Sequence, residues 1–270
     1  MPTINHVIHQ LSALSGPLTA HTVDTLKAGD ETAEVRGIAT VFMASHAILE
    51  TAIERGLNLV ITHEAPFYHH FDQIDILADD PIYLTKKALI EESGIAVFRW
   101  HDHIHRNAPD LVVEGLLRDL EWTPYVEAQE SRMSLPLKTP PLAIPTMTLE
   151  EVARHVKRKL DVPFVRVVGD LAMPCTRVGL LPGYCGGGAL AIPFFQGDEL
   201  DLIITGEGPE WETPEYVRDA VSQGRTKALI VLGHGKSEES GMKYLADWVK
   251  PMFPDIRIEF IADPPLFRAV

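Results

Sequence analysis

A short apolar run that ends in polar residues occurs twice in this chain of 270 residues, and this repeat restricts the fold more than any other feature. The first copy is Leu59-Val-Ile-Thr-His-Glu64, and the second is Leu202-Ile-Ile-Thr-Gly-Glu207. Runs of Val, Ile and Leu without alternation are typical of buried strands in a parallel sheet. Polar residues just past the carboxyl end of such a strand lie where α/β folds place their chemistry. Both runs therefore predict buried strands that end at a functional edge.

A second pair of runs follows in the same order. Ile95-Ala-Val-Phe-Arg-Trp100 leads into His101, and Ala228-Leu-Ile-Val-Leu232 precedes Gly233-His234. Two matches in one order indicate an internal duplication of a strand-helix-strand unit. We expect an α/β fold with two similar, closely packed lobes and a site in the cleft between them.

Helices and further strands fill the intervals between these runs. Apolar residues at helical spacing predict an opening helix over 5–14, and Thr148 with Glu151 has the spacing of a capping box at a helix start. Further helices are expected at 46–55, 84–92 and 189–196, and further strands at 34–43 and 177–181. The segment 134–145 contains four prolines and cannot form a regular helix. The predicted division is a first lobe over 1–133, a Pro-rich connection over 134–147 and a second lobe over 148–270, intertwined as one domain.

Charge and composition exclude several classes of partner. The chain has 24 Lys and Arg against 38 Asp and Glu, a formal charge of −14, which repels nucleic-acid backbones and anionic membranes. Its apolar runs are far shorter than a membrane span, and its start lacks the basic and apolar regions of a secretory signal, so a cytoplasmic location is expected. Cys175 and Cys185 are interpreted as ordinary small residues of a reducing compartment. The 12 histidines are unusual in such an acidic chain, because imidazole and carboxylate together are ligands of Zn, Mn, Fe and Ni.

Histidines and carboxylates recur at the predicted strand ends. His63 and Glu64 end one strand, and two histidines have a possible ligand four residues later: His101 to His105, and His234 to Glu238. Residues i and i+4 face the same way on a helix, so each pair can share one ion. The alternative is that these groups are solvated strand ends and helix starts.

Other polar residues are more ambiguous. Glu207 is a general base, a group that orients a ligand, or the partner of a cation such as Arg218 or Lys227. His69 and His70 are expected to be exposed. The glycine-rich segment 183–188 lacks the spacing of a nucleotide-binding loop and is interpreted as a tight strand-to-helix turn.

The ordered set of these motifs resembles the Nif-three-like family, the GTP cyclohydrolase I type 2 homologues. The motifs are His63, His101-x-x-x-His105, Thr205-Gly-Glu207 and Gly233-His234-x-x-x-Glu238, and the similarity spans nearly the whole chain. The resemblance implies a duplicated α/β fold, a cleft that holds two divalent metal ions, and assembly into a hexameric ring.

The resemblance also implies a ligand set. Where the family has His-His, this chain has His63-Glu64, and where the family's second motif ends in Asp, this chain has His105. The third motif matches at His234 and Glu238. The implied metal ligands are His63, Glu64, His105, His234 and Glu238, with His101 as a further possibility. They keep the family's total of three histidines and two carboxylates.

The resulting functional hypothesis is a metal-dependent hydrolase. Two divalent ions lower the pKa of a bridging water, and Glu64 or Glu207 accepts its proton. The substrate is an unidentified small molecule. The alternative is a non-catalytic metal-binding scaffold or regulatory oligomer, which would close the coordination position that a catalytic site keeps open.

Overall fold

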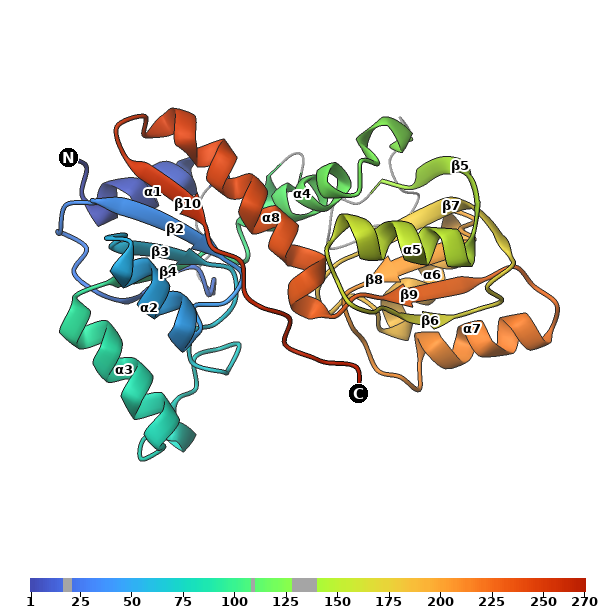
Figure 1. The fold of residues 1–270 in the computed structure, drawn as a ribbon, viewed down its shortest axis with the longest axis horizontal. Coiled ribbons are helices and arrows are strands. Elements are labelled where there is room, and N and C mark those ends of the chain that lie inside the picture. Colours follow the sequence, from blue (N-terminus) through green and yellow to red (C-terminus); the bar gives the residue numbers. More distant parts are fainter. Residues whose placement is uncertain (17–20, 108–109, 128–139) are drawn as a thin grey trace. The chain divides into compact units, whose positions relative to one another are not determined.

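The computed structural model describes residues 1–16, 21–107, 110–127 and 140–270, and within them the chain is a mixed α/β protein (Figure 1). These residues form eight α-helices and two five-stranded sheets. They divide into two compact units. The first comprises Met1–Leu111 and Met242–Pro264, and the second comprises Val112–Gly241 and Pro265–Val270.

The first unit contains a mostly parallel sheet of order β1-β4-β3-β2-β10. The central strands β2, β3 and β4 and the edge strand β10 run parallel, and β1 pairs antiparallel with β4 at the other edge. The strands are β1 (Leu26–Ala28), β2 (Gly37–Val41), β3 (Leu59–Thr62), β4 (Ala96–Arg99) and β10 (Arg257–Phe260). The helices are α1 (Ile4–Leu14), α2 (His46–Glu54) and α3 (Pro81–Ser93), with single 3-10 turns at Asp75–Leu77, Ile104–Arg106 and Lys250–Met252.

Local capping signals fix the helix ends. Asp80 accepts hydrogen bonds from the backbone N–H groups of Ile82 and Tyr83, and Pro81 takes the first helical position, so α3 begins three residues before the predicted start. Gly94 ends α3 with a φ of 66°, in the left-handed conformation that glycine adopts without strain. The strand predicted over 34–43 is shorter in the structure, where β2 covers only Gly37–Val41.

The two faces of the first sheet are covered by different helices. Ile48 and Leu49 of α2 and Ile90 of α3 pack with Val60 and Val97 of the central strands. On the other face lie α1 and the last part of α8 (His234–Val249), where the backbone carbonyl of Met242 accepts a hydrogen bond from the Thr40 hydroxyl (Figure 1). Because both faces are covered, every residue of β2, β3 and β4 is buried.

The second unit repeats this parallel core. Its sheet has the order β5-β7-β8-β9-β6, in which β7, β8 and β9 are parallel and both edge strands are antiparallel. The strands are β5 (Leu142–Thr148), β6 (Arg166–Val168), β7 (Pro174–Leu181), β8 (Leu202–Thr205) and β9 (Ala228–Val231). The helices are α4 (Leu111–Asp119), α5 (Leu149–Lys159), α6 (Gly188–Gly197) and α7 (Thr213–Ser222), with a 3-10 turn at Thr123–Tyr125.

The duplication is visible in the register. Leu59 of β3 pairs with Ala96 of β4, and Leu202 of β8 pairs with Ala228 of β9, so each strand-helix-strand unit places the same sequence positions side by side. The predicted duplicated α/β fold with two similar lobes is therefore confirmed. Thr148 and Glu151 form the predicted capping box at the start of α5.

The Pro-rich connection expected from the sequence is partly a strand. Residues 134–139 of the Pro-rich connection predicted over 134–147 lie outside the described residues, and residues 142–147 belong to β5. Pro145 is tolerated there because β5 is an edge strand with an irregular register between Ala143 and Met147.

Among the described residues, no helix is long and apolar enough to cross a membrane.

Candidate metal centre

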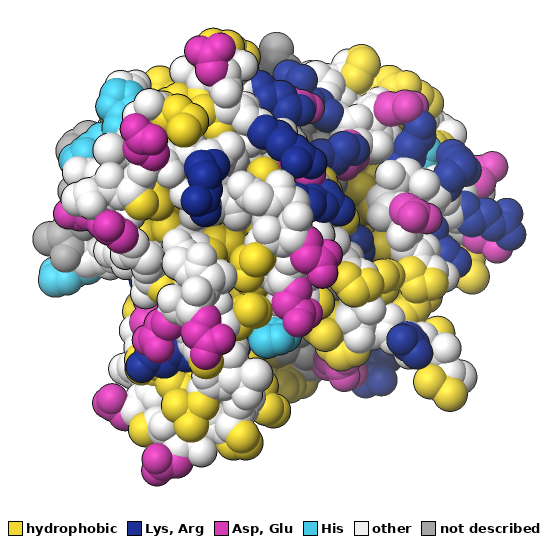
Figure 2. All heavy atoms as spheres, turned by 60° about the vertical axis from the view of Figure 1, so that its left-hand side comes forward, with side chains coloured by type: hydrophobic (Ala, Val, Ile, Leu, Met, Phe, Trp, Pro, Cys, Tyr) yellow, Lys and Arg dark blue, Asp and Glu magenta, His cyan; other side chains and the backbone are white. Residues whose placement is uncertain are grey.

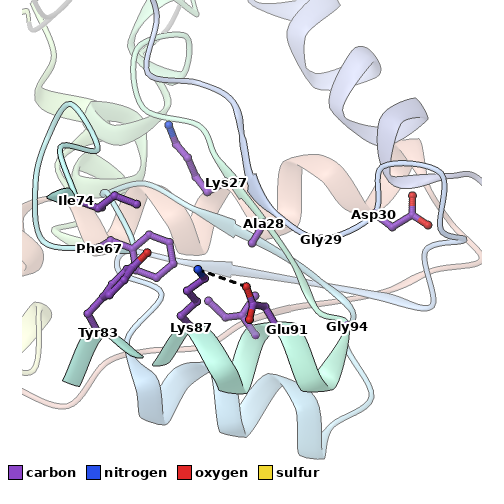
Figure 3. A pocket seen from close by; sticks show the side chains of 11 residues that line it. Lys27, Ala28, Gly29, Asp30, Phe67, Ile74, Tyr83, Lys87, Glu91 and Gly94 are labelled. Atoms are coloured by element: carbon purple, nitrogen blue, oxygen red, sulfur yellow. Dashed lines mark ion pairs between the residues drawn. The ribbon is translucent and has the colours of Figure 1, made fainter. Parts of the chain in front are cut away.

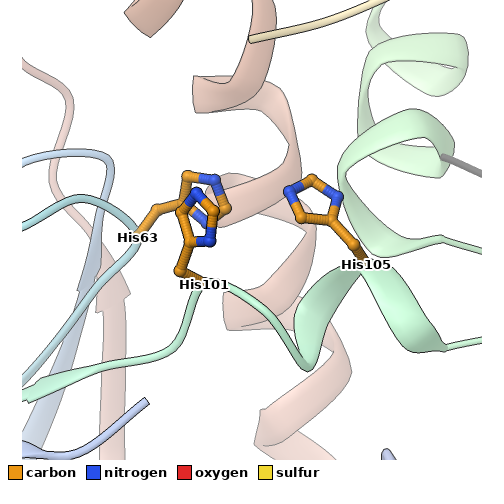
Figure 4. Close-up of side chains that lie close together, drawn as sticks. All are labelled: His63, His101 and His105. Carbon is orange, nitrogen blue, oxygen red and sulfur yellow. The ribbon is translucent and has the colours of Figure 1, made fainter. Parts of the chain in front are cut away.

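Three histidines converge at the carboxyl edge of the first sheet. His63 follows β3, His101 follows β4, and His105 lies in the 3-10 turn after it (Figure 4). One ring nitrogen from each lies within 4.8 Å of the others. The ring centroids of His63 and His101 are 4.6 Å apart in a stacked arrangement, and His105 meets His63 edge-on at 5.2 Å. We call His63, His101 and His105 the trihistidine cluster.

Carboxylates hold two rings of the trihistidine cluster in place. Asp110 lies 3.0 Å from Nδ1 of His105, and Asp102 lies 3.0 Å from Nδ1 of His101. A carboxylate on one ring nitrogen fixes the tautomer and directs the other nitrogen toward a metal. Neither aspartate was predicted from the sequence to be an orienting group, although both lie within five residues of the histidines that they contact.

A buried aspartate from another part of the chain organises the loop that carries these histidines. Asp24 accepts hydrogen bonds from the backbone N–H groups of His101, Asp102 and His103 at 2.6, 2.9 and 2.8 Å. Its carboxylate also contacts Nδ1 of His103. Asp24 and His103 are both buried, so the contact between them and the three backbone hydrogen bonds to Asp24 hold the loop in place. No local pattern in the sequence links residues separated by nearly eighty positions.

The carboxylates also change the protonation of His101. Burial by itself lowers the pKa of His101, but the hydrogen bonds to Asp102 and Glu64 outweigh it and raise the pKa to about 9. The hydrogen bond from His101 in turn holds the pKa of Asp102 well below its usual range. A metal ion would therefore have to displace a firmly held proton to bind His101.

Glu64 lies between the Arg99 guanidinium and the His101 ring. Its Oε2 atom forms a 3.0 Å ion pair with Nη2 of Arg99, whose side chain is fully buried. Its Oε1 atom lies 3.6 Å from Nε2 of His101. Glu64, His70 and His101 form a second group of possible ligands within 4.8 Å, directly beside the Arg99 guanidinium. Burial, Arg99 and His101 together lower the pKa of His70.

The second unit carries a carboxylate-imidazole-carboxylate arrangement. His234 begins α8, and its Nδ1 atom lies 2.8 Å from Oε1 of Glu207. Its Nε2 atom lies 3.1 Å from Oε2 of Glu238, which is buried one helical turn further along α8. Glu207 thus contacts His234, whereas Arg218 pairs with Glu215 and Lys227 donates to the backbone carbonyl of Leu200. The predicted i, i+4 pair shares one helix face.

The glycine-rich segment is a tight turn packed against these donors. Gly183 has a φ of 64°, and a Cβ atom there would lie 2.3 Å from Oε1 of Glu238. A Cβ atom at Gly206 would lie 2.4 Å from both the Gly183 carbonyl and the Ser237 hydroxyl. Gly206 is the second-repeat equivalent of His63, so close packing explains why the repeat does not keep a histidine there.

A separate pocket lies elsewhere in the first unit. It has a volume of about 530 Å³, and its lining includes the Phe67 and Tyr83 rings and the Lys87–Glu91 ion pair of 3.7 Å (Figure 3). The trihistidine cluster is not part of this lining. Exposed hydrophobic side chains are interspersed with charged ones on the face in Figure 2, an ordinary surface composition that indicates no particular partner.

Together these features define an internally duplicated α/β protein with imidazole and carboxylate donors at the carboxyl edges of its sheets. Residues 2–264 match the sequence profile of the Duf34/NIF3 (NGG1p interacting factor 3) family. The chain therefore belongs to this family.

Solved structures share the fold at low sequence identity. Staphylococcus aureus protein SA1388 superposes with a TM-score of 0.77 at 19% identity over 100% of this chain and 99% of that chain. A Bacillus cereus protein related to NIF3 gives a TM-score of 0.72 at 16% identity, covering 99% of both chains. Reduced HcgD from Methanocaldococcus jannaschii gives 0.71 at 14% identity over 96% of this chain and 97% of that chain. No curated protein matches the chain.

Proposed function

We propose that this protein binds a divalent metal ion through the trihistidine cluster and uses it in a hydrolytic reaction. The observation that carries the proposal is the convergence of three ring nitrogens within 4.8 Å, two of them on rings oriented by Asp102 and Asp110. Neutral imidazoles oriented in this way are the ligand set that Zn, Mn, Fe and Ni share.

The ligand count favours catalysis over a purely structural role. Three protein ligands leave a coordination position open for water, whereas structural sites close it with a fourth protein ligand. A bound ion would supply an acidified water at that position. His63, His101 and His105 would hold the ion, and Asp102 and Asp110 would keep the imidazoles in the required tautomers.

Glu64 is the proton acceptor that we assign in the first unit. Its Oε1 atom faces Nε2 of His101 at 3.6 Å, while Arg99 holds the other oxygen in a fixed position. In the second unit, Glu207 orients His234 toward Glu238, and we propose that His234 and Glu238 provide further metal ligands. The two-ion site predicted from the sequence combines donors of both units and stays a prediction, as does assembly into a hexameric ring.

The test of this function has two stages. The metal content of protein purified without an affinity tag is measured by plasma mass spectrometry for wild type, His105→Ala and His155→Ala, the last as a control because His155 stacks on Trp122 in the second unit. We expect bound Zn, Mn, Fe or Ni in wild type and control, and a large loss in His105→Ala. The metal-loaded protein is then assayed on phosphoester, ester and cyclic amide substrates, with Glu64→Gln as the inactive comparison.

Each stage can contradict the proposal separately. Equal metal content in all three proteins would exclude the trihistidine cluster as the site. Metal that depends on His105 without hydrolysis of any of these substrate classes would favour the non-catalytic scaffold.

A further inference from the structure

We propose that the Arg99 guanidinium excludes a metal ion from the Glu64 side of the trihistidine cluster, so that the first unit binds one ion and Glu64 is a counter-ion, not a ligand. This inference rests on the proposed function, because it concerns how many ions the same site accepts. Glu64 then differs from the metal ligand that the family resemblance implies.

Arg99 is fixed in place by four contacts. Its Nε atom donates to the backbone carbonyl of His63 at 3.2 Å, and its Nη1 atom donates to the backbone carbonyl of His70. Its Nη2 atom lies 3.0 Å from Oε2 of Glu64 and 3.1 Å from Nδ1 of His70. The side chain is fully buried, and a guanidinium does not lose its proton in proteins. A permanent positive charge therefore lies beside Glu64 and His70.

The same contacts occupy ligand atoms of both His70 and Glu64 that a second ion would need. When Nδ1 of His70 accepts a hydrogen bond from Arg99, the neutral ring carries its proton on Nε2, so that atom has no lone pair for a metal. One oxygen of Glu64 is already paired with the guanidinium. A cation entering here would also meet the charge of the fully buried Arg99 at short range, where repulsion is screened less than in bulk water.

His101 sets a further limit, because it belongs to both groups of possible ligands that lie wholly within the first unit. Its Nδ1 atom is engaged by Asp102, so only Nε2 can bind an ion. That single nitrogen can serve the trihistidine cluster or the Glu64 group, but not both. The trihistidine cluster has the better electrostatic environment, since the Asp110 carboxylate lies behind His105 and attracts a cation.

The chain's own departure from the family pattern fits this arrangement. Where the family that it resembles has a second histidine, this chain has Glu64, and the buried partner of Glu64 is a cation from β4. Arg99 and Glu64 therefore form a fixed ion pair at a place where a histidine pair would have been able to bind metal.

The test is a cobalt titration of the full chain in a His234→Ala background, which removes the histidine that lies between Glu207 and Glu238 in the second unit. Bound Co²⁺ is followed by visible absorption and counted after gel filtration. We expect one equivalent in the background protein, one equivalent with a Kd changed less than threefold in Glu64→Gln, and at least a hundredfold weaker binding in His105→Ala. The matched control is Glu50→Gln, which alters an exposed glutamate that is also next to a histidine.

A gain of binding gives the decisive contrast. In the same background, Arg99→Leu removes the cation that holds Glu64 and His70, and we expect a second, weaker equivalent of Co²⁺ to appear. Two equivalents before Arg99 is replaced, or Glu64→Gln as damaging to cobalt binding as His105→Ala, would overturn the inference while leaving the proposed function intact. No cobalt in any of these proteins would overturn both. The Glu64→Gln comparison decides the matter even if Arg99→Leu does not fold.

Discussion

Replacing Asp24 with asparagine should dismantle the metal centre without touching any of its proposed ligands. The Asp24 carboxylate receives three backbone N–H groups and contacts the His103 ring, and both residues are buried. Asparagine is nearly the same size but offers only one acceptor oxygen. Its NH₂ group would point at N–H groups that need an acceptor, so the loop that carries His101 and His105 would lose its attachment.

The magnitude follows from the number of hydrogen bonds lost. A hydrogen bond to a charged group contributes about 1.5–3 kcal/mol, and at least two of the four contacts would be lost in the Asn variant. The free energy of unfolding of the first unit should fall by about 3–6 kcal/mol. At roughly 4 °C per kcal/mol for a domain of this size, the thermal midpoint should fall by more than about 10 °C.

Calorimetry of the metal-free protein measures this change, and chelator competition measures metal affinity at a temperature where the variant is still folded. We expect metal affinity at least about tenfold weaker than in wild type, because groups that support metal ligands typically contribute 10- to 100-fold. Asp30→Asn is the matched control, since Asp30 is an exposed aspartate that caps a turn close to β1. A wild-type midpoint and wild-type affinity in Asp24→Asn would refute the assignment of Asp24 as the loop anchor.

Three further predictions test other parts of the structure. Lys86 is buried, and burial lowers its pKa to about 8 from 10.5. Between these pH values the unfolded state binds more protons than the folded state, so the free energy of unfolding should rise by about 3 kcal/mol from pH 8 to 10.5. Urea unfolding of wild type and Lys86→Met checks this, and the same pH slope in both would contradict it. Gly183→Ala would bring a methyl group against Glu238 and require a strained φ, so we expect a loss of about 2 kcal/mol or more in chemical denaturation of the second unit; wild-type stability would show that the turn can relax. His103→Ala should lower the thermal midpoint through the loss of its contact with Asp24, whereas His105→Ala should mainly lower metal content. If the two variants changed the thermal midpoint equally and the metal content equally, the separate roles of His103 and His105 would be contradicted.

The fold was predictable because its signals are local. Buried parallel strands are recognisable as continuous apolar runs. The repeat of Leu59–Glu64 at Leu202–Glu207 indicates the duplication together with the second pair of runs that follows in the same order. Helix ends depended on capping residues, and the early start of α3 at Pro81 shows that the Asp80 cap outweighed the apolar periodicity. The role of Leu142–Thr148 was missed because proline usually argues against a strand, and only its edge position makes Pro145 acceptable.

The candidate site was predictable in its imidazole and carboxylate donors and less so in the contacts that surround them. Strand ends and i, i+4 spacing pointed to His63, His105 and the His234–Glu238 pair, and the structure gives His101 equal weight with the other two histidines of its cluster. The roles of Asp24 and Arg99 depend on contacts between distant segments of the chain. No sequence pattern could have indicated that Arg99 forms an ion pair with Glu64, because that pairing arises from the alignment of β3 with β4.

The most direct test of the proposed metal centre is a crystal structure of the metal-loaded protein with diffraction data collected on both sides of the metal absorption edge. We expect one anomalous peak in the first unit, at bonding distance from ring nitrogens of His63, His101 and His105, with the Arg99–Glu64 ion pair intact beside it. A peak bonded to Glu64 with Arg99 displaced, or no peak near the three histidines in a protein that retains metal, would contradict this expectation.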